Sequence, residues 1–224
     1  MVTRYDDVAR IVDGIPNTTP SQGRRLYDFV REHALREILE LGFAHGVSTC
    51  YLAAAVASSG SGSVITIDDR SALDRQPTIH DLLERTGLTA LVTPVFAHTT
   101  YTWELANLID RQSVDGTCTP IFDFCFVDGA HTWQVDGLAF FLVEKLLKPG
   151  GWILFDDLDW TFEASPTLAQ TKSVRAMSAD ERTTPQVGRV YDLLVRQHLG
   201  FEALRVDGSW GWARKKDAGA RTPY

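Results

Sequence analysis

The chain has 224 residues, of which 44% are apolar, 23% charged and 10% aromatic, an ordinary globular composition. Its 29 acidic residues outnumber its 22 basic ones, and the net charge of −7 disfavours the phosphate-neutralising surface that a nucleic-acid-binding protein needs. Because a chain of this length can bury one sizeable core without disulfides or structural metals, we expect a single domain over residues 1–224 that binds no nucleic acid.

The sequence predicts neither export nor membrane insertion. Residues 1–10 alternate acidic and basic side chains and lack the apolar core of a signal peptide. No apolar run approaches the ~18 residues of a membrane span. Cys50, Cys118 and Cys125 show no C-x-x-C spacing, so neither a disulfide framework nor a zinc site is indicated. We therefore expect a cytoplasmic protein that does not associate with membranes.

Apolar runs of strand length alternate with segments of helical period, which predicts an α/β fold with a mostly parallel sheet. The helical segments are 20–33, which would cap the site, then 48–58, 79–86, 103–110, 133–147 and 187–199. The predicted strands are 37–42, 64–68, 91–96, 122–128, 152–156, 201–206 and 209–214. The last two are joined by Asp207-Gly208, a dipeptide typical of hairpin turns. Residues 111–120 predict a polar loop, and residues 158–184 predict a lid inserted over the strand ends.

Acidic residues stand at the carboxyl ends of four of the five predicted parallel strands. They are Glu40, Asp68, Asp128, and the pair Asp156 and Asp157. In open α/β sheets ligands bind outside these strand ends, near the point where the strand order reverses. We therefore expect the functional site at this edge of the sheet.

A glycine-containing turn connects the first strand to the next helix, and it contains Gly42 and Gly46. Glycine lets the backbone approach a ligand closely, and the helix N-terminus offers free N–H groups. Asp68 follows about 20 residues later, the separation at which a carboxylate accepts hydrogen bonds from the ribose of a nucleoside cofactor. Ala44 and His45 occupy the space of a pyrophosphate, which favours a cofactor without phosphates. Two ordinary turn glycines remain the alternative.

The stretches that carry these residues resemble the motifs of class I S-adenosylmethionine-dependent methyltransferases. Residues 38–48 are similar to the first motif, 64–68 to the second, and 146–151 to the turn before the fifth strand. The resemblance implies a Rossmann-like seven-stranded, mostly parallel sheet with helices on both faces and a C-terminal antiparallel hairpin. It also implies S-adenosylmethionine as the cofactor. The residues expected to contact it are Glu40, Gly42, Gly46, Ser48, Asp68, His98 and Asp128; solvation alone is the alternative for His98.

Within that family the chain resembles catechol O-methyltransferase-like enzymes and related metal-dependent sugar O-methyltransferases, from about residue 21 to residue 214. Their metal-binding positions match Asp128, Asp156 and Asp157. Independently of the resemblance, neighbouring carboxylates repel one another unless a cation or a proton neutralises them, and oxygen ligands favour Mg²⁺ or Ca²⁺. The alternative is that Asp156 caps the next segment while Asp157 points to solvent.

His131, three residues after Asp128, is the predicted catalytic base. The resemblance implies this role, because a histidine plays it in several sugar-type relatives, whereas the catechol-type enzymes have a lysine there. A histidine near pKa 6.5 can accept a hydroxyl proton at neutral pH. The alternative is a histidine that only packs at the helix N-terminus. Trp160, in the predicted lid, is expected to contact the substrate.

The leading hypothesis is an S-adenosylmethionine- and Mg²⁺-dependent O-methyltransferase for a small molecule of natural-product, catechol-like or sugar type. A metal-independent methyltransferase is the second reading. A nicotinamide-dependent oxidoreductase is disfavoured, because the turn lacks the pyrophosphate glycine and the sequence has no Tyr-x-x-x-Lys pair. A non-catalytic scaffold also remains open, since a fold alone does not guarantee activity. The sequence selects no substrate and leaves a homodimer open.

Overall fold

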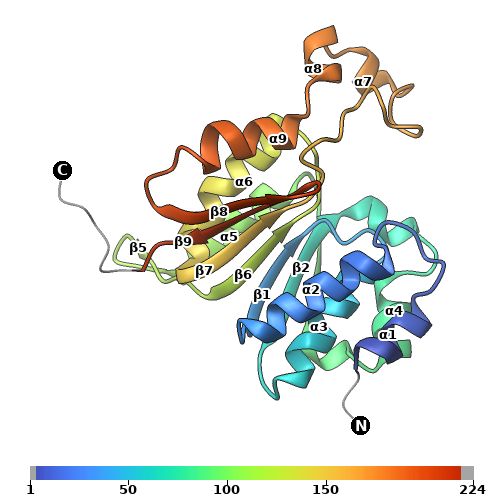
Figure 1. Cartoon of the computed structure of the whole chain (residues 1–224), viewed down its shortest axis with the longest axis vertical. Coiled ribbons are helices and arrows are strands. Elements are labelled where there is room, and N and C mark those ends of the chain that lie inside the picture. The colour runs from blue at the N-terminus through green and yellow to red at the C-terminus, as the bar shows by residue number, and fades with distance from the viewer. Residues whose placement is uncertain (1–3, 218–224) are drawn as a thin grey trace.

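A seven-stranded sheet forms the centre of the protein (Figure 1), for which a computed structural model describes residues 4–217. The ends of the predicted domain, residues 1–3 and 218–224, lie outside the described residues. The strands are β1 (Glu37–Leu41), β2 (Ser63–Asp69), β3 (Val92–Ala97), β6 (Phe122–Val127), β7 (Leu147–Phe155), β8 (Phe201–Asp207) and β9 (Trp210–Lys215). Their order is β3-β2-β1-β6-β7-β9-β8. β9 pairs antiparallel with both β7 and β8, and the other pairs are parallel, which confirms the predicted fold class.

The strand order reverses beside β1, which pairs with β2 on one side and β6 on the other. This is the place where an open α/β sheet binds its ligands. β1 and β6 are buried over nearly their whole length, as expected for parallel strands covered on both faces. The mostly apolar sequences of these two strands, interrupted only by Glu40 and Asp123, agree with this central position.

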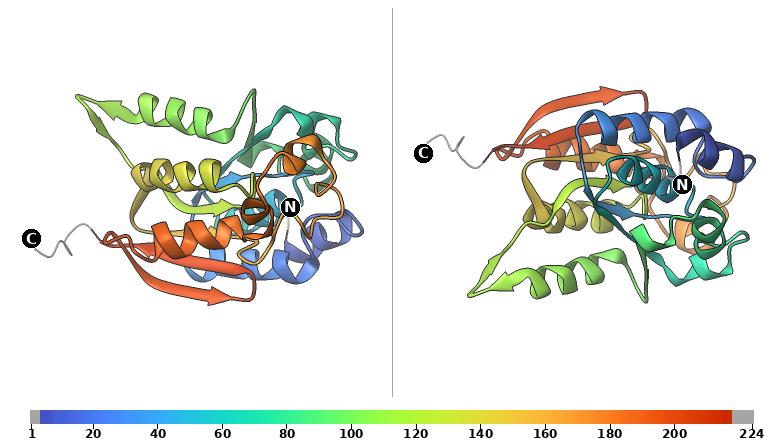
Figure 2. Two further views of the ribbon diagram at one scale, coloured as in Figure 1. Left: turned by 90° about the horizontal axis from the view of Figure 1, so that it is seen from above. Right: turned by 90° about the horizontal axis from the view of Figure 1, so that it is seen from below.

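Helices cover both faces of the sheet, and each layer has its own apolar core (Figures 1 and 2). One layer contains α1 (Tyr5–Ile11), α2 (Pro20–Glu32), α3 (Val47–Ser58) and α4 (Ile79–Thr86). The other contains α5 (Tyr101–Gln112), α6 (Trp133–Leu146) and α9 (Gln186–Val190), which continues as a π-helical turn, Tyr191–Val195. Two 3₁₀ turns, Arg70–Asp74 and Thr89–Leu91, flank α4.

Local sequence signals determine where several helices begin and end. Thr19 and Gln22 form a reciprocal capping box at the start of α2, which has proline at its first position. Thr78 and Asp81 form the same arrangement on α4, which ends at the left-handed Gly87. The capping box of α2 orients the Gln22 side chain, which reaches the candidate site.

Three short features differ from the sequence-based expectation. α1 is not predicted by the sequence pattern, because its seven residues bury only Val8 and show no extended apolar period. The predicted polar loop 111–120 contains a small hairpin of β4 (Ser113–Val114) and β5 (Thr117–Cys118). Its turn residues, Asp115 and Gly116, both have positive φ, so this Asp-Gly pair is the hairpin signal that was overlooked. β7 begins at Leu147 rather than 152, through an irregular register beside Phe122.

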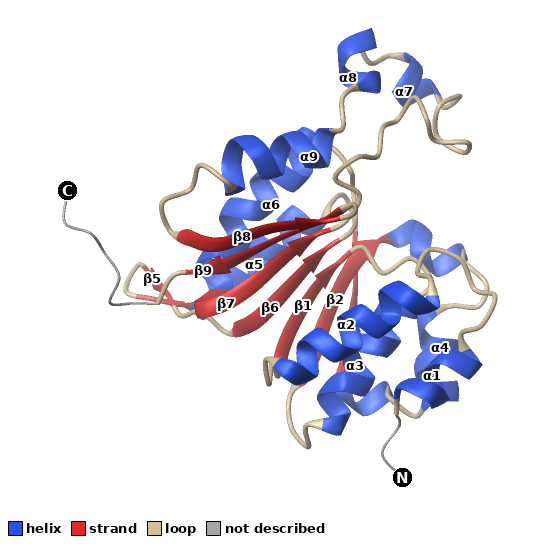
Figure 3. Cartoon of the chain, viewed as in Figure 1, coloured by secondary structure: helices blue, strands red, loops and turns tan. Residues whose placement is uncertain are grey.

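Residues 158–184 leave the sheet and form an irregular excursion with two short helices, α7 (Lys172–Arg175) and α8 (Ala179–Thr183) (Figure 3). An ion pair of 3.0 Å between Glu163 and Arg182 closes the base of this excursion. Its role as a lid stays a prediction. Among the described residues, no helix is long and apolar enough to cross a membrane.

Candidate functional site

The carboxyl ends of the central strands meet at one edge of the sheet, and backbone hydrogen bonds continue the strand pairing past them. The N–H of Asp128 donates to the carbonyl of Leu41 at 2.8 Å, and the N–H of Asp156 donates to the carbonyl of Val127 at 3.0 Å. The N–H of Gly42 donates to Ile67 in the same way, at 2.8 Å. The acidic strand ends are therefore neighbours, as the sequence predicts for parallel strands.

Asp128, His131 and Asp157 form a compact cluster at this edge. The Nε2 atom of His131 lies 3.0 Å from Oδ2 of Asp157 and 3.6 Å from Oδ1 of Asp128. The side chains of Asp128 and His131 are both 19% exposed, whereas that of Asp157 is 37% exposed. One edge of the cluster is thus open to a ligand, while the rest is enclosed by protein.

Two members of the cluster have strained backbone conformations. His131 has φ +56° and Asp157 has φ +58°. Both values lie in the left-handed region, which residues other than glycine adopt uncommonly. Such conformations persist only where the surrounding structure enforces them, and they concentrate at functional sites. The geometry that brings the imidazole between the carboxylates therefore depends on two unusual backbone positions.

The cluster redistributes its protons. Burial is the strongest influence on Asp128 and raises its pKa to about 7, although the neighbouring imidazole opposes the rise. Burial lowers the pKa of His131, but the two carboxylates outweigh this effect and raise it to about 10. At neutral pH His131 is therefore an imidazolium ion that neutralises part of the acidic charge. The sequence predicts that a cation or a proton must neutralise the neighbouring carboxylates, and the proton on His131 does so in part.

Asp156, the third predicted metal ligand, is held by hydrogen bonds outside this compact group, although its charge helps to raise the pKa of Asp128. It is 5% exposed, and its Oδ1 accepts hydrogen bonds from the N–H of Asp157 at 2.6 Å and from Ser209 Oγ at 3.2 Å. Its Oδ2 accepts a longer hydrogen bond from Gln22 Nε2 at 3.4 Å. Asp156 thus links β7 to α2 and to the turn between β8 and β9. In this arrangement His131, and not Asp156, stands with Asp128 and Asp157.

The cluster is suited in composition to a divalent cation. One ligand atom from each of Asp128, His131 and Asp157 can be chosen so that all lie within 4.8 Å of one another. Two carboxylates and an imidazole are common ligands of divalent transition metals, whereas Mg²⁺ prefers oxygen ligands. The residues present fit such an ion: with the two carboxylates alone the oxygen ligands favour Mg²⁺, and with the imidazole as a third ligand the preference moves toward Mn²⁺ or its neighbours.

The predicted cofactor turn has a left-handed backbone at Gly42, Ala44 and Gly46, with φ of +88°, +49° and +91°. A Cβ on Gly42 would stand 2.2 Å from the carbonyl oxygen of Asp128, so this glycine is required where the first strand meets the acid cluster. Asp68 Oδ2 accepts the N–H groups of Phe43 and Ala44 at 2.9 and 2.7 Å. Asp68 thus shapes the turn; a carboxylate oxygen can accept further hydrogen bonds, so its contact with a ribose stays a prediction.

Glu40 lies beneath this turn and is fully buried. Its Oε2 accepts hydrogen bonds from Thr49 at 2.5 Å and Thr66 at 2.6 Å, whereas its Oε1 has no hydrogen-bond partner among the described residues. Burial raises the pKa of Glu40, and the hydroxyl groups around it, including that of Ser48, oppose this rise. This buried oxygen beside the predicted cofactor turn is therefore available to accept a hydrogen bond.

The predicted contacts at the periphery differ in how closely they approach the site. His98 is exposed, and its Nε2 lies 3.2 Å from Arg70 Nη1 after β3. Trp160 places its ring 5.0 Å from the His131 ring and 4.7 Å from the Phe162 ring, measured between centroids. Trp160, the predicted substrate contact, thus lies against His131, the predicted base. The contact of His98 is with Arg70.

Sequence reasoning missed two residues that support the site. Tyr101 and Asp136 reach it from α5 and α6, respectively. Tyr101 and Asp136 are 35 positions apart in the sequence and touch only because α5 and α6 pack together. Gln22 lies in the segment 21–23, which resembles the family's entry segment over the cofactor, and it reaches the site from α2.

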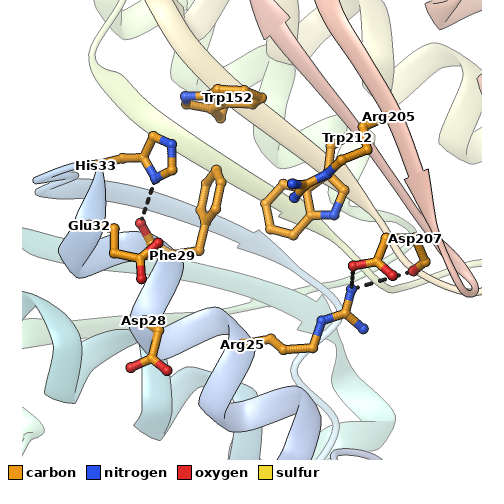
Figure 4. A pocket seen from close by; sticks show the side chains of 9 residues that line it. All are labelled: Arg25, Asp28, Phe29, Glu32, His33, Trp152, Arg205, Asp207 and Trp212. Carbon is orange, nitrogen blue, oxygen red and sulfur yellow. Dashed lines mark hydrogen bonds and ion pairs between the residues drawn. The ribbon is translucent and has the colours of Figure 1, made fainter.

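A groove of about 280 Å³ lies elsewhere, between α2 and the β7-β9-β8 edge of the sheet (Figure 4). Phe29, Trp152 and Trp212 form its apolar floor, and an ion pair of 2.7 Å between Arg25 and Asp207 crosses one end. None of the predicted site residues lines this groove. The acid cluster and the cofactor turn therefore define the candidate site without it.

The profile of a protein family described as "Methyltransferase domain" matches residues 39–158, which is more than half of the chain. None of the curated proteins compared matches the sequence significantly. Several solved structures share the fold at low sequence identity. An O-methyltransferase from Bacillus cereus in complex with S-adenosylhomocysteine has a TM-score of 0.64 and 22% identity, covering 95% of this chain and 90% of its own.

Two further structures give the same picture of the fold. An O-methyltransferase of tomaymycin synthesis from Streptomyces achromogenes, in complex with S-adenosylmethionine, has a TM-score of 0.63 and 19% identity, covering 95% of this chain and 89% of its own. A putative caffeoyl-CoA O-methyltransferase from Staphylococcus aureus has a TM-score of 0.64 and 18% identity, covering 94% and 90%. At these identities the likeness establishes the architecture.

Proposed function

Since this chain belongs to the methyltransferase-domain family, we propose that it transfers a methyl group from S-adenosylmethionine to a hydroxyl oxygen of a small molecule. The observation that carries the proposal is the placement of the Asp128–His131–Asp157 cluster directly beside the left-handed Gly42 turn. A cofactor site and a proton-handling site then share one edge of the sheet. The oxygen acceptor agrees with the printed names of the structural neighbours.

In this reaction the methyl carbon leaves the sulfonium sulfur and bonds to the acceptor oxygen, while the hydroxyl proton passes to a base. The products are a methyl ether and S-adenosylhomocysteine. Because opposite charges cancel during the transfer, positioning of the two reactants supplies most of the rate. We assign the methionine part of the cofactor to Gly42, Gly46 and Ser48, and its ribose to Asp68. The ammonium group of the methionine part is assigned to Glu40. His98 is the proposed adenine neighbour.

His131 is the proposed base, with Asp128 and Asp157 controlling its proton. As long as both carboxylates contact the ring, its pKa of about 10 keeps the proton on the imidazole. His131 would therefore accept a proton once Asp128 and Asp157 no longer both contact its ring, as when they hold a cation or bind the acceptor. A divalent cation held by Asp128 and Asp157, with Asp156 beside them, would lower the pKa of the acceptor hydroxyl. Trp160, which lies against His131, is the proposed wall of the acceptor pocket.

A metal-independent methyltransferase is the second candidate, and one observation favours it. The imidazolium ion of His131 already supplies a positive charge between Asp128 and Asp157, so the carboxylates are neutralised in part without a metal. In that case Asp128, whose pKa is raised to about 7, is placed to exchange a proton at neutral pH.

The predicted cytoplasmic location and the homodimer stay predictions.

Calorimetric titration of S-adenosylhomocysteine, followed by an activity assay, distinguishes the metal-dependent methyltransferase, the metal-independent methyltransferase and the non-catalytic scaffold. The protein is titrated in Mn²⁺, in Mg²⁺ and in excess chelator, and methyl transfer from labelled S-adenosylmethionine to a panel of small hydroxyl compounds is then followed in the same buffers. Binding in every buffer with transfer only in metal supports the first candidate. Binding and transfer in chelator support the second. Absence of binding in all three buffers would overturn the cofactor assignment itself.

A further inference from the structure

Tyr101 and Asp136 form a buried pair behind the loop that joins Asp128 to His131. Tyr101 is the first residue of α5, and Asp136 lies in the first turn of α6. The Tyr101 hydroxyl donates a hydrogen bond to Oδ1 of Asp136 and accepts one from the N–H of Ala130 at 3.2 Å. Ala130 is therefore tied through one hydroxyl group to the carboxylate of another helix.

The Tyr101 ring supports the same loop by packing. A Cβ on Gly129 would stand 2.5 Å from the ring, so the ring lies directly against the loop backbone. Tyr101 is only 5% exposed and Asp136 only 1% exposed. Burial also raises the pKa of Tyr101 well above its ordinary value, so the hydroxyl keeps its proton and remains a donor.

Burial of the Asp136 carboxylate is expected to lower the free energy of unfolding. Its Oδ2 is buried without a hydrogen-bond partner of good geometry among the described residues, although the N–H groups of His131 and Thr132 lie near enough to limit the rise of its pKa. Apolar replacement of such a group is often neutral or stabilising. The next residue in the loop after Ala130 is His131, whose left-handed backbone requires an external constraint. The buried pair contacts the two residues that precede His131 and is therefore placed to provide that constraint.

We propose that Tyr101 and Asp136 are positioning residues that hold the Asp128–His131 loop in the conformation that groups Asp128, His131 and Asp157. The effect on ligand binding rests on the proposed function, whereas the effect on the loop does not. Loss of the pair should release the His131 ring from Asp157 and leave the cofactor turn at Gly42 unchanged, because Asp68 holds that turn from another strand.

Four variants test the inference. Tyr101→Phe removes the hydroxyl, and Asp136→Leu removes its acceptor at similar side-chain volume. Asp136→Asn keeps an acceptor oxygen and is the conservative rescue. Tyr191→Phe is the matched control, since Tyr191 is also a buried tyrosine, and its hydroxyl donates to the carbonyls of Trp212 at 2.7 Å and Arg205 at 3.2 Å. Each variant is examined by amide hydrogen exchange, Mn²⁺ titration, S-adenosylhomocysteine calorimetry and thermal melting.

Tyr101→Phe and Asp136→Leu should speed exchange of the Ala130 amide and weaken Mn²⁺ binding by about tenfold or more, as removal of a residue that orients metal ligands does elsewhere. S-adenosylhomocysteine affinity should stay within about twofold in the same variants. Asp136→Asn and Tyr191→Phe should match the wild type in both loop exchange and Mn²⁺ affinity, whatever their melting temperatures.

Unchanged loop exchange in both disruptive variants, or an equal effect of Tyr191→Phe, would overturn the inference. If the wild type binds no Mn²⁺, the metal part of the proposed function fails, and the crystal structure of Tyr101→Phe decides the inference by itself. A His131 ring still within hydrogen-bond distance of Asp157 in that structure refutes it, whereas a released ring supports it.

Discussion

His131 carries the most specific prediction at the scale of single residues. If it handles the acceptor proton, His131→Gln should lower turnover by about 100-fold or more, because a positioned acid or base contributes factors of that size. S-adenosylhomocysteine affinity should change little, since no cofactor contact is assigned to His131. Steady-state kinetics and calorimetry on the purified variant measure the two effects separately.

His198→Gln is the matched control for this substitution. His198 also faces a carboxylate, with its Nε2 3.6 Å from Glu144, but it lies at the opposite end of the sheet, just before β8. Its replacement should retain turnover. If His131→Gln and His198→Gln proved equally active, His131 would have no part in proton transfer.

The ion pairs of His131 predict a specific dependence of stability on pH. Its folded-state pKa, about 10, lies above the unfolded value near 6.5, so the folded protein holds this proton more tightly. The stabilisation is complete below about pH 6.5 and is lost as the pH rises toward 10. Urea unfolding between pH 6 and pH 10 should therefore show a steeper loss of stability in the wild type than in His131→Gln. Parallel curves for the two proteins would show that the ion pairs do not form.

At the scale of elements, the turn between β1 and α3 should depend on Gly42 for two separate reasons. An alanine there would be strained at φ +88° and would also press its Cβ against the Asp128 carbonyl, 2.2 Å away. We expect Gly42→Ala to cost about 3 kcal/mol or more of unfolding free energy, from strain and overpacking together, and to abolish cofactor binding. Urea unfolding and calorimetry measure these effects.

Gly60→Ala separates strain from close contact. Gly60 has a similar φ of +81°, yet a Cβ there would meet nothing within 4 Å. Its replacement should cost only the strain of about 1–2 kcal/mol and leave cofactor binding intact. Equal costs at the two positions would mean that the approach of Gly42 to Asp128 is not tight in solution.

The elements themselves were largely predictable because their signals are local. Periodicity located the five parallel strands, and the Asp207-Gly208 pair indicated the C-terminal hairpin, both as observed. The same reasoning overlooked the Asp115-Gly116 pair, whose strands are too short to show alternation. The gathering of the acids at one edge also followed from sequence, since parallel strands end on the same side.

The arrangement within the site was not predictable in the same way. Whether Asp156 or His131 stands beside Asp128 depends on left-handed backbone at His131 and Asp157, and no sequence signal marks a positive φ at histidine or aspartate reliably. The support from Tyr101 depends on packing between α5 and α6, which is a tertiary contact. Side-chain direction, rather than fold, was therefore the missing information.

At the scale of the whole molecule, the cofactor turn lies where the two helical layers meet the sheet edge. Elements from both layers touch the site: α2 through Gln22, and α5 and α6 through the loop that carries His131. A ligand that binds only the folded state stabilises all these contacts together. At 100 times its dissociation constant it contributes about 2.7 kcal/mol.

For a chain of this size that contribution corresponds to a rise in melting temperature of roughly 5–10 °C. We therefore expect saturating S-adenosylhomocysteine to raise the melting temperature of the wild type by this amount and that of Gly42→Ala by almost nothing. NADH at the same concentration is the control ligand, because Ala44 and His45 occupy the space that a pyrophosphate requires. At equal concentration, the ligand with the higher affinity for the folded protein raises the melting temperature more. A larger shift with NADH than with S-adenosylhomocysteine would therefore contradict the proposed cofactor.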